Sequence, residues 1–208
     1  MSLPKGGILK MDKEIQSANI EQHPLKPFIP QHARLLMLGS FPPARKRWSM
    51  DFFYPNYIND MWRIYGLCFF ENKDYFVDSL QKTFRKELLV DFLTEKGVAL
   101  FDTASAVVRT TGTAADKDLE VVTPTDLDAL LRQIPECRAV VVTGQKAADV
   151  FTSHFQIVQP KVGGFTEFVF EDRPLRFYRM PSSSRAYPMK IERKAAFYLR
   201  MFQEIGLL

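Results

Sequence analysis

The residues best suited to chemistry lie between positions 39 and 62, in the connection after the first buried run of the chain. Its three consecutive cations are Arg45, Lys46 and Arg47. Adjacent cations cannot all pair with acids in most conformations, so this run is either a solvated loop tip or a contact for phosphate. Four aromatic residues follow, among them Phe53 and Tyr54, and two of the four are expected to pack in the core. An aromatic face beside cations also suits stacking on a nucleic-acid base.

Two further side chains could act on a bound substrate. Asn59 stands where a helix is predicted to begin, so it is either a plain helix cap or a catalytic amide. An amide can orient water through its oxygen and donate a hydrogen bond through its nitrogen. Asp102 ends the second buried run, where it could recognise a base edge, activate water or cap the turn after its strand.

A second polar loop, "RMPSSSRAYP", joins a short strand to a basic helix at the end of the chain. Its hydroxyl-bearing residues are Ser182, Ser183 and Ser184. Taken alone, they predict an ordinary turn. Because the cations Arg185 and Lys190 follow them, and because a basic loop is expected at the same sheet edge, they favour a second contact with a nucleic-acid backbone.

Several classes of protein are excluded by what the sequence lacks. Two cysteines, Cys68 and Cys137, make neither a disulfide framework nor a zinc site, and the three histidines have no metal-ligand spacing. Phosphate-loop, dinucleotide, nucleophile-elbow and HExxH motifs are absent, so no cofactor or metal is expected. No signal peptide or 18-residue apolar run appears, so a cytoplasmic location is expected, and the net charge of +4 permits a polyanionic partner.

Buried strands predicted over residues 33–40, 98–104 and 138–144 alternate with helices predicted over 58–70, 123–135 and 144–155. One or two more helices are expected over 73–97, two shorter strands over 166–172 and 175–184, and a closing helix over 189–208. Thr125 is expected to cap the helix at 123–135. This alternation indicates a parallel α/β sandwich. Residues 1–30 read as an arm, in which the first seven resemble an expression leader, and residues 31–208 as one domain. Ligands of such sheets bind beyond the carboxyl ends of the strands, where all of the loops described above should meet.

Five motifs resemble the uracil-DNA glycosylase superfamily in order and spacing, between about Arg34 and Met201: "LLMLGSFP", "FFYPNYINDMWRIYG", "GVALFDTASAVVR", "AVVVTGQKAADVF" and "RMPSSSRAY". Within the superfamily, the chain is most similar to the branch with hypoxanthine-DNA (deoxyinosine) and mismatch-specific uracil glycosylases. The resemblance implies a three-layer α/β/α sandwich around a central, mainly parallel sheet of four to five strands. It also suggests an inserted helical segment near residues 70–96.

The resemblance also implies roles for single residues. Asn59, three residues before Trp62, matches the catalytic amide of the branch, and Asp102 is a second catalytic candidate. The residues implied to contact the base are Gly39, Ser40, Phe41, Phe53, Tyr54, Thr103 and Ser105. The residues expected to contact DNA, from the last motif together with the basic residues described above, are Arg45, Lys46, Arg47, Pro181, Ser182, Ser183, Ser184, Arg185 and Lys190. The chain departs from the best-known uracil enzymes at Phe41, where they carry an activating Asp, and at Met180, where they carry a His.

The expected function is that of a monofunctional DNA glycosylase in base excision repair. It would hydrolyse the N-glycosidic bond of a deaminated base, hypoxanthine or uracil, after the base has flipped out of duplex DNA. The protein is expected to be a monomer, without membrane contact, and to associate with the nucleoid. Two alternatives remain open: a catalytically silent nucleic-acid-binding domain on the same fold, and a small-molecule α/β enzyme that uses the same sheet edge.

Overall fold

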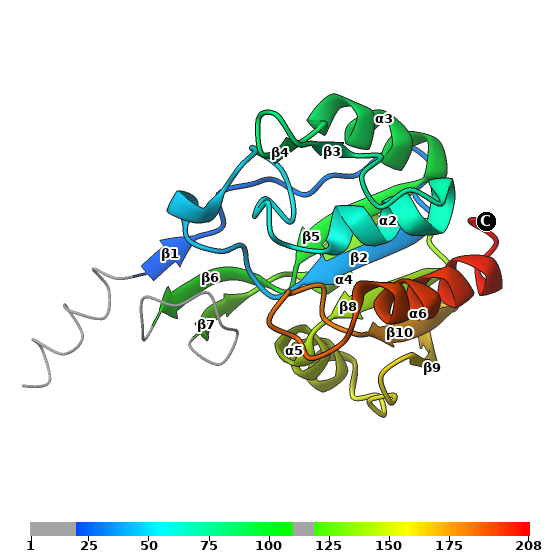
Figure 1. Cartoon of the computed structure of the whole chain (residues 1–208). Coiled ribbons are helices and arrows are strands. Elements are labelled where there is room, and N and C mark those ends of the chain that lie inside the picture. Colours follow the sequence, from blue (N-terminus) through cyan, green and yellow to red (C-terminus); the bar gives the residue numbers. More distant parts are fainter. Residues whose placement is uncertain (1–19, 110–118) are drawn as a thin grey trace, which may run out of the picture.

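The computed structural model describes residues 20–109 and 119–208, and a five-stranded sheet lies at its centre (Figure 1). The strands follow the order β5 (Val98–Asp102), β2 (Leu35–Gly39), β8 (Ala139–Thr143), β10 (Arg173–Met180) and β9 (Gly164–Phe170). The strands from β5 to β10 pair in parallel, whereas β9 pairs with β10 in antiparallel. The predicted mixed α/β fold is therefore confirmed, with an antiparallel strand at one edge.

Strands β2, β5 and β8 are buried along their whole length, as continuous apolar runs are when a sheet is covered on both faces. Their register brings the strand ends together at one edge of the sheet. Gly39 at the end of β2 lies opposite Asp102 at the end of β5, and Met180 at the end of β10 lies opposite Thr143 at the end of β8. Two residues that the sequence analysis proposed for the site are thus direct neighbours.

The helices are α2 (Met61–Phe70), α3 (Lys86–Lys96), α4 (Leu127–Arg132), α5 (Gln145–Phe155) and α6 (Ile191–Glu204). Helices α2 and α6 pack side by side, which brings the start of α2 next to the loop that precedes α6 (Figure 1). None of the helices in residues 20–109 and 119–208 has both the length and the apolar character needed to cross a membrane.

A second, antiparallel sheet of three strands was not predicted. It consists of β1 (Ile20–Gln22), β6 (Ala104–Arg109) and β7 (Leu119–Pro124), in the order β1-β6-β7. A single residue, Thr103, separates β5 from β6, so the chain continues into a strand where the sequence analysis placed a loop. Strand β1 belongs to the predicted arm, so this part of the arm is paired with the domain through backbone hydrogen bonds. The predicted leader lies outside the described residues.

Two local predictions were wrong. Residues 73–85 were predicted as helix but contain the hairpin of β3 (Val77–Asp78) and β4 (Thr83–Phe84), whose turn is held by Asp78 accepting from the N–H groups of residues 80 and 81. A short Asp side chain that binds the backbone in this way favours a turn over a helix. The cap of α4 is Asp126, whose side chain accepts from the third helical N–H, whereas Thr125 is buried and donates to the carbonyl of Asp102.

Candidate active site

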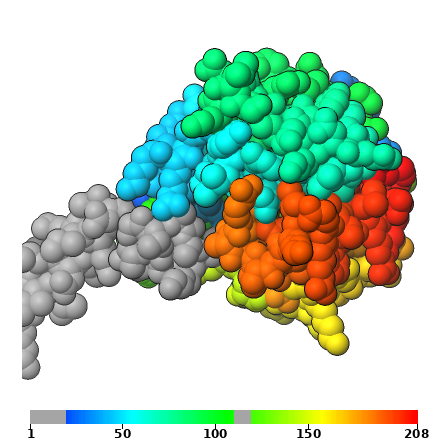
Figure 2. Space-filling view, in the orientation of Figure 1, coloured from blue at the N-terminus to red at the C-terminus, as the bar shows by residue number. Residues whose placement is uncertain are grey.

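A groove with a volume of about 700 Å³ lies at the carboxyl edge of the central sheet. Five separate segments line it: the connection from β2 to α2, the end of β5, the turn after β8, Val162 before β9, and the end of β10 with the loop that follows it. Figure 2 shows the loop after β10, in orange, against the cyan segment that precedes α2. The site residues proposed from the sequence that line this groove are Gly39, Ser40, Phe41, Arg47, Phe53, Tyr54, Asn59, Asp102, Pro181, Ser182, Ser183, Ser184 and Arg185.

Asn59 is partly buried at the wall of the groove and also caps the backbone at the start of α2. Its Oδ1 accepts a hydrogen bond from the N–H of Met61 at 2.8 Å. Because a backbone N–H only donates, this bond fixes which end of the amide is oxygen. Within the described part of the chain, the Nδ2 donors of Asn59 have no partner. The cap and the amide donor are therefore both present in one side chain.

Asp102 lines the groove at the end of β5 and is 7% exposed. A side chain on Gly39, its neighbour in β2, would place a Cβ only 2.4 Å from Asp102 Oδ1, so any other residue at position 39 would force the carboxylate to shift. The other oxygen, Oδ2, lies 2.9 Å from Nε2 of His23, which comes from the arm. Sequence reasoning missed this histidine because its contact spans 79 residues.

The aromatic residues of the first loop divide between the core and the groove wall. Phe53 is 4% exposed and packs edge-on against Phe52 and Phe101, at centroid distances of 5.4 and 6.4 Å. Tyr54 is more exposed and has a positive φ of 49°, a conformation that non-glycine residues seldom adopt. Its hydroxyl lies 3.3 Å from Oγ1 of Thr143 in the turn after β8. Both rings line the groove, and Tyr54 offers the larger accessible surface.

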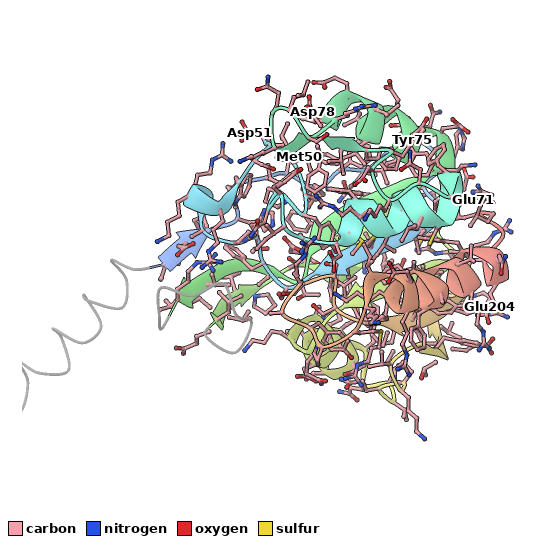
Figure 3. All side chains as sticks on the ribbon, viewed as in Figure 1. Met50, Asp51, Glu71, Tyr75, Asp78 and Glu204 are labelled. Carbon is pink, nitrogen blue, oxygen red and sulfur yellow. The ribbon has the colours of Figure 1, made fainter. Side chains whose placement is uncertain are left out.

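The connection that carries these rings is braced by its own hydrogen bonds. Nε1 of Trp48 donates to the carbonyl of Pro43 at 2.7 Å, and Nε1 of Trp62 in α2 donates to the carbonyl of Phe53 at 3.1 Å. The β3–β4 hairpin adds a bond from Thr83 Oγ1 to the carbonyl of Ser49 at 2.6 Å. Figure 3 labels Met50 and Asp51 in this connection and Asp78 in the hairpin. The long loop is thus a fixed part of the wall.

Asp60 joins the start of α2 to the loop after β10. Its side chain accepts from Nη2 of Arg185 at 3.1 Å and from Nζ of Lys194 at 2.9 Å, and its N–H donates to the carbonyl of Ser183 at 2.9 Å. Lys194 is 0% exposed and donates also to the carbonyl of Ser184 at 2.7 Å. Neither Asp60 nor Lys194 was predicted to matter, because neither position in the sequence reveals the long-range pairing.

The serines of the loop after β10 retain hydrogen-bonding capacity. Oγ of Ser182 accepts from the N–H of Ser184, and Oγ of Ser184 accepts from the N–H of Ala186, at 3.2 and 3.3 Å. A hydroxyl that accepts in this way still holds one donor proton, which can point outward to an anion. The carbonyl of Pro181 accepts from the buried hydroxyl of Tyr198 at 3.0 Å, which ties the loop to α6.

The predicted cations do not form one cluster. Arg47 lines the groove and makes no ion pair among the described residues, whereas Arg45 is paired with Asp51 and stacks over Trp48 at 4.3 Å. Lys46 is exposed beside them in the short helix Arg45–Arg47. Lys190 lies outside the groove, in a second cavity of about 480 Å³ between the starts of α2 and α6.

Two residues predicted to contact the base do not line the groove. Thr103 is 0% exposed, and its Oγ1 has no hydrogen-bond partner among the described residues. Ser105 belongs to strand β6 of the second sheet, and its hydroxyl lies 3.2 Å from Oγ1 of Thr125. Strand β6 explains both positions, because it turns the chain away from the groove directly after Asp102.

Buried titratable groups behind the groove belong to the core. Burial raises the pKa of Tyr65 well above its usual value, with a smaller effect of the neighbouring Tyr54 and Cys68, and burial raises the pKa of Cys68 to about 12. Burial likewise raises the pKa of Cys137 to about 11. Such thiols are poor nucleophiles. In residues 20–109 and 119–208, no cluster of three or more His, Cys, Asp or Glu side chains is arranged to hold a metal ion.

Comparisons with known proteins bear on the fold. No protein-family model and no curated protein matches the chain. The fold is similar to the solution NMR structure of a "putative Uracil DNA glycosylase" from Methanosarcina acetivorans, with a TM-score of 0.58 and 19% sequence identity over 90% of this chain and 99% of that one. At this identity the similarity establishes a shared fold.

Proposed function

We propose that this protein is a DNA glycosylase that hydrolyses the N-glycosidic bond of a deaminated base, hypoxanthine or uracil, flipped out of duplex DNA. The observation that carries the proposal is the single groove that holds the Asn59 amide, the Asp102 carboxylate, two aromatic rings and a serine-rich loop. Its volume of about 700 Å³ lies within the range of roughly 300–1,000 Å³ typical of small-ligand sites, which admits a nucleobase with its sugar. The fold shared with the archaeal protein supports the same reading.

The groove contains groups for each charge that the reaction creates. Cleavage builds positive charge on the sugar and negative charge on the departing base. The free Nδ2 donors of Asn59 suit the base anion, and the start of α2 beside them adds a favourable dipole. Asp102 stabilises the cationic sugar. It also accepts a proton from the attacking water while the water oxygen bonds to the anomeric carbon. The glycosidic electron pair leaves with the base.

DNA would lie across the groove, with the loop after β10 and Arg47 on its backbone. The serine hydroxyl protons and the guanidinium of Arg47, which has no ion pair within residues 20–109 and 119–208, suit phosphate oxygens. Residues 181–186 contain no large apolar side chain, but Ile58 at the groove wall is 54% exposed. Its N–H is held by Oδ1 of Asn56 at 3.2 Å. Because this side chain is large, apolar and exposed, we propose that it fills the space that a flipped base leaves.

The substrate class follows from the cost of flipping. Extruding a base costs a few kcal/mol and least when the base is mispaired. Uracil opposite guanine and hypoxanthine opposite thymine are such mispairs. The protein would act on them as a monomer in a nucleoid-associated, cytoplasmic setting and without a cofactor.

The test is base release from duplexes that contain uracil, hypoxanthine or xanthine, measured in single turnover. Asn59→Asp keeps an acceptor for the N–H of Met61 but removes the amide donors, so it separates catalysis from capping. We expect its rate to fall by roughly 10²–10³-fold, the usual effect of losing one donor to a developing anion. Asn72→Ala removes a comparable bond, from the N–H of Asp74, in an exposed turn, and should leave the rate unchanged. Absence of release from all three duplexes by the wild type would refute the proposal.

A catalytically silent binding domain is the second candidate. Phe41 and Met180 favour it, because both line the groove with side chains that cannot exchange a proton, where the best-known uracil enzymes carry acid and imidazole. It predicts salt-dependent binding to mismatched or abasic duplex without base release.

A further inference from the structure

His23 is buried beside the groove although it comes from the arm that precedes the domain. Its Nε2 lies 2.9 Å from Oδ2 of Asp102, and the two side chains are only 4% and 9% exposed. Buried His–carboxylate pairs fix the orientation of both groups. We propose that His23 is a positioning residue: it holds one oxygen of Asp102 so that the other, Oδ1 beside Gly39, receives the proton of the attacking water.

The imidazole ring is itself fixed. Phe101, Phe41 and Phe53 surround it, at centroid distances of 4.5, 5.3 and 6.3 Å. Rotation of the ring would require these packed side chains to move. The backbone holds the residue as well, because the N–H of His23 donates to the carbonyl of Ser105 at 2.8 Å. The position of Nε2 is therefore set by the docking of β1 on β6.

The hydrogen-bond partners assign a direction to the His23–Asp102 bond. A carboxylate only accepts, so Nε2 carries the proton and donates to Oδ2. Nδ1 has both the N–H of Leu25, at 3.2 Å, and its carbonyl, at 2.8 Å, within reach. Nδ1 thus has a hydrogen-bond partner whether it accepts or donates, so both ring nitrogens of His23 are satisfied. The nearest other charges on β1 and β6, Glu21 and Arg109, pair with each other at 2.9 Å.

The geometry leaves Asp102 with divided tasks. Oδ2 is occupied by His23, whereas Oδ1 has no hydrogen-bond partner among the described residues. Oδ1 lies against the backbone of Gly39, which also lines the groove. A carboxylate base whose second oxygen is held by another side chain follows the general pattern of a base positioned by a third residue. Phe41 has no carboxylate, so Asp102 supplies this group from the end of β5, and His23, directly after β1, orients it.

The inference rests on the proposed function, and the experiment separates the two. Single-turnover base release and affinity for an abasic duplex are measured for His23→Phe, which keeps a ring but loses the donor, and for His23→Gln, which keeps a donor. We expect His23→Phe to lower the rate on the order of 10- to 100-fold, the effect of losing a hydrogen bond to a charged group, with unchanged affinity. His23→Gln should recover most of the rate. The control is His32→Phe, which removes an exposed pair with Glu136 in the same part of the chain and should have no effect.

A double-mutant cycle shows whether His23 acts through the acid. In an Asp102→Asn background, His23→Phe should cause little further loss, because both substitutions disable one unit. An active wild type with a fully active His23→Phe variant would overturn the inference and leave the proposed function intact. The inference would also fail if the two losses multiplied, or if His23→Gln were as slow as His23→Phe. An inactive wild type would refute both.

Discussion

Lys194→Met should destabilise the protein more than the loss of any exposed ion pair that the structure describes. The ammonium group of Lys194 is fully buried and makes two hydrogen bonds, to Asp60 at 2.9 Å and to the carbonyl of Ser184 at 2.7 Å. Methionine keeps most of the side-chain volume, so the substitution removes the charge and the donors with little change in packing. Removing one partner of a buried pair typically costs about 3–5 kcal/mol, because the other charge remains buried.

The structure places this substitution near the lower end of that range. Asp60 keeps a second cation, Arg185, at 3.1 Å, although the Arg185 side chain is 55% exposed and its charge is partly screened by water. We therefore expect a loss of about 3 kcal/mol in the free energy of unfolding. For a chain of this size, about 2–4 °C of melting temperature corresponds to each kcal/mol, so the midpoint should fall by about 6–12 °C.

The assay is urea unfolding of wild type and variant at neutral pH, with thermal melts as a second measure. Arg200→Met is the matched control, because it also removes a cation from α6. The side chain of Arg200 is 76% exposed, and its partner, Glu204, is four residues away in the same helix. It should cost no more than about 0.5 kcal/mol. The reasoning would be refuted if Lys194→Met cost as little as the control. The combined variant with Asp60→Leu should lose less than the sum of the two single losses, because no buried charge is then left alone.

Three other predictions follow from the groove and the core. Gly39→Ala should abolish base release with a folded protein, since the new Cβ would meet Asp102 Oδ1 at 2.4 Å; single-turnover assays with circular dichroism check it, and full activity would contradict it. Ile58→Ser should lower the flipped fraction reported by 2-aminopurine fluorescence in a duplex, whereas Ile58→Leu should not. Burial raises the pKa of Cys68 to about 12, so this thiol should resist alkylation at pH 8 in the folded protein. Its contribution to stability should be complete below about pH 8.5 and should fall as the pH rises towards 12, because only the unfolded thiol ionises in that range. Urea unfolding midpoints measured across this pH range test the second expectation.

The parts of the fold that could be predicted are those with a local signal. Strands β2, β5 and β8 are short apolar runs bounded by polar residues, and Asn59 stands two residues before α2, whose residues are mostly apolar. Residues 73–85 were wrongly predicted as helix, because their apolar residues fit a helical spacing, whereas Asp78 binds the backbone in a turn. Strand β6 was missed because it follows β5 with one intervening residue, which leaves no loop signal between them.

The position of a residue at the groove could be predicted only where its own segment of the sequence carries the signal. The loop with Arg47, Tyr54 and Asn59 and the loop with Ser182 line one groove, as the parallel sheet requires of loops at its carboxyl edge. His23 could not be found in this way, because its significance comes from a strand pairing that no local pattern encodes.

The long reach of the contacts at the groove has a consequence for how the protein folds. The bonds that complete the site join residues 79, 125 and 134 positions apart: His23 with Asp102, and Asp60 with Arg185 and with Lys194. Pairings of such high sequence separation form late, because loop closure must precede them. Refolding monitored by helical signal should therefore run ahead of refolding monitored by ligand binding. The set extends from His23 to Lys194, so the groove is complete only when segments near both ends of the chain have folded onto the domain.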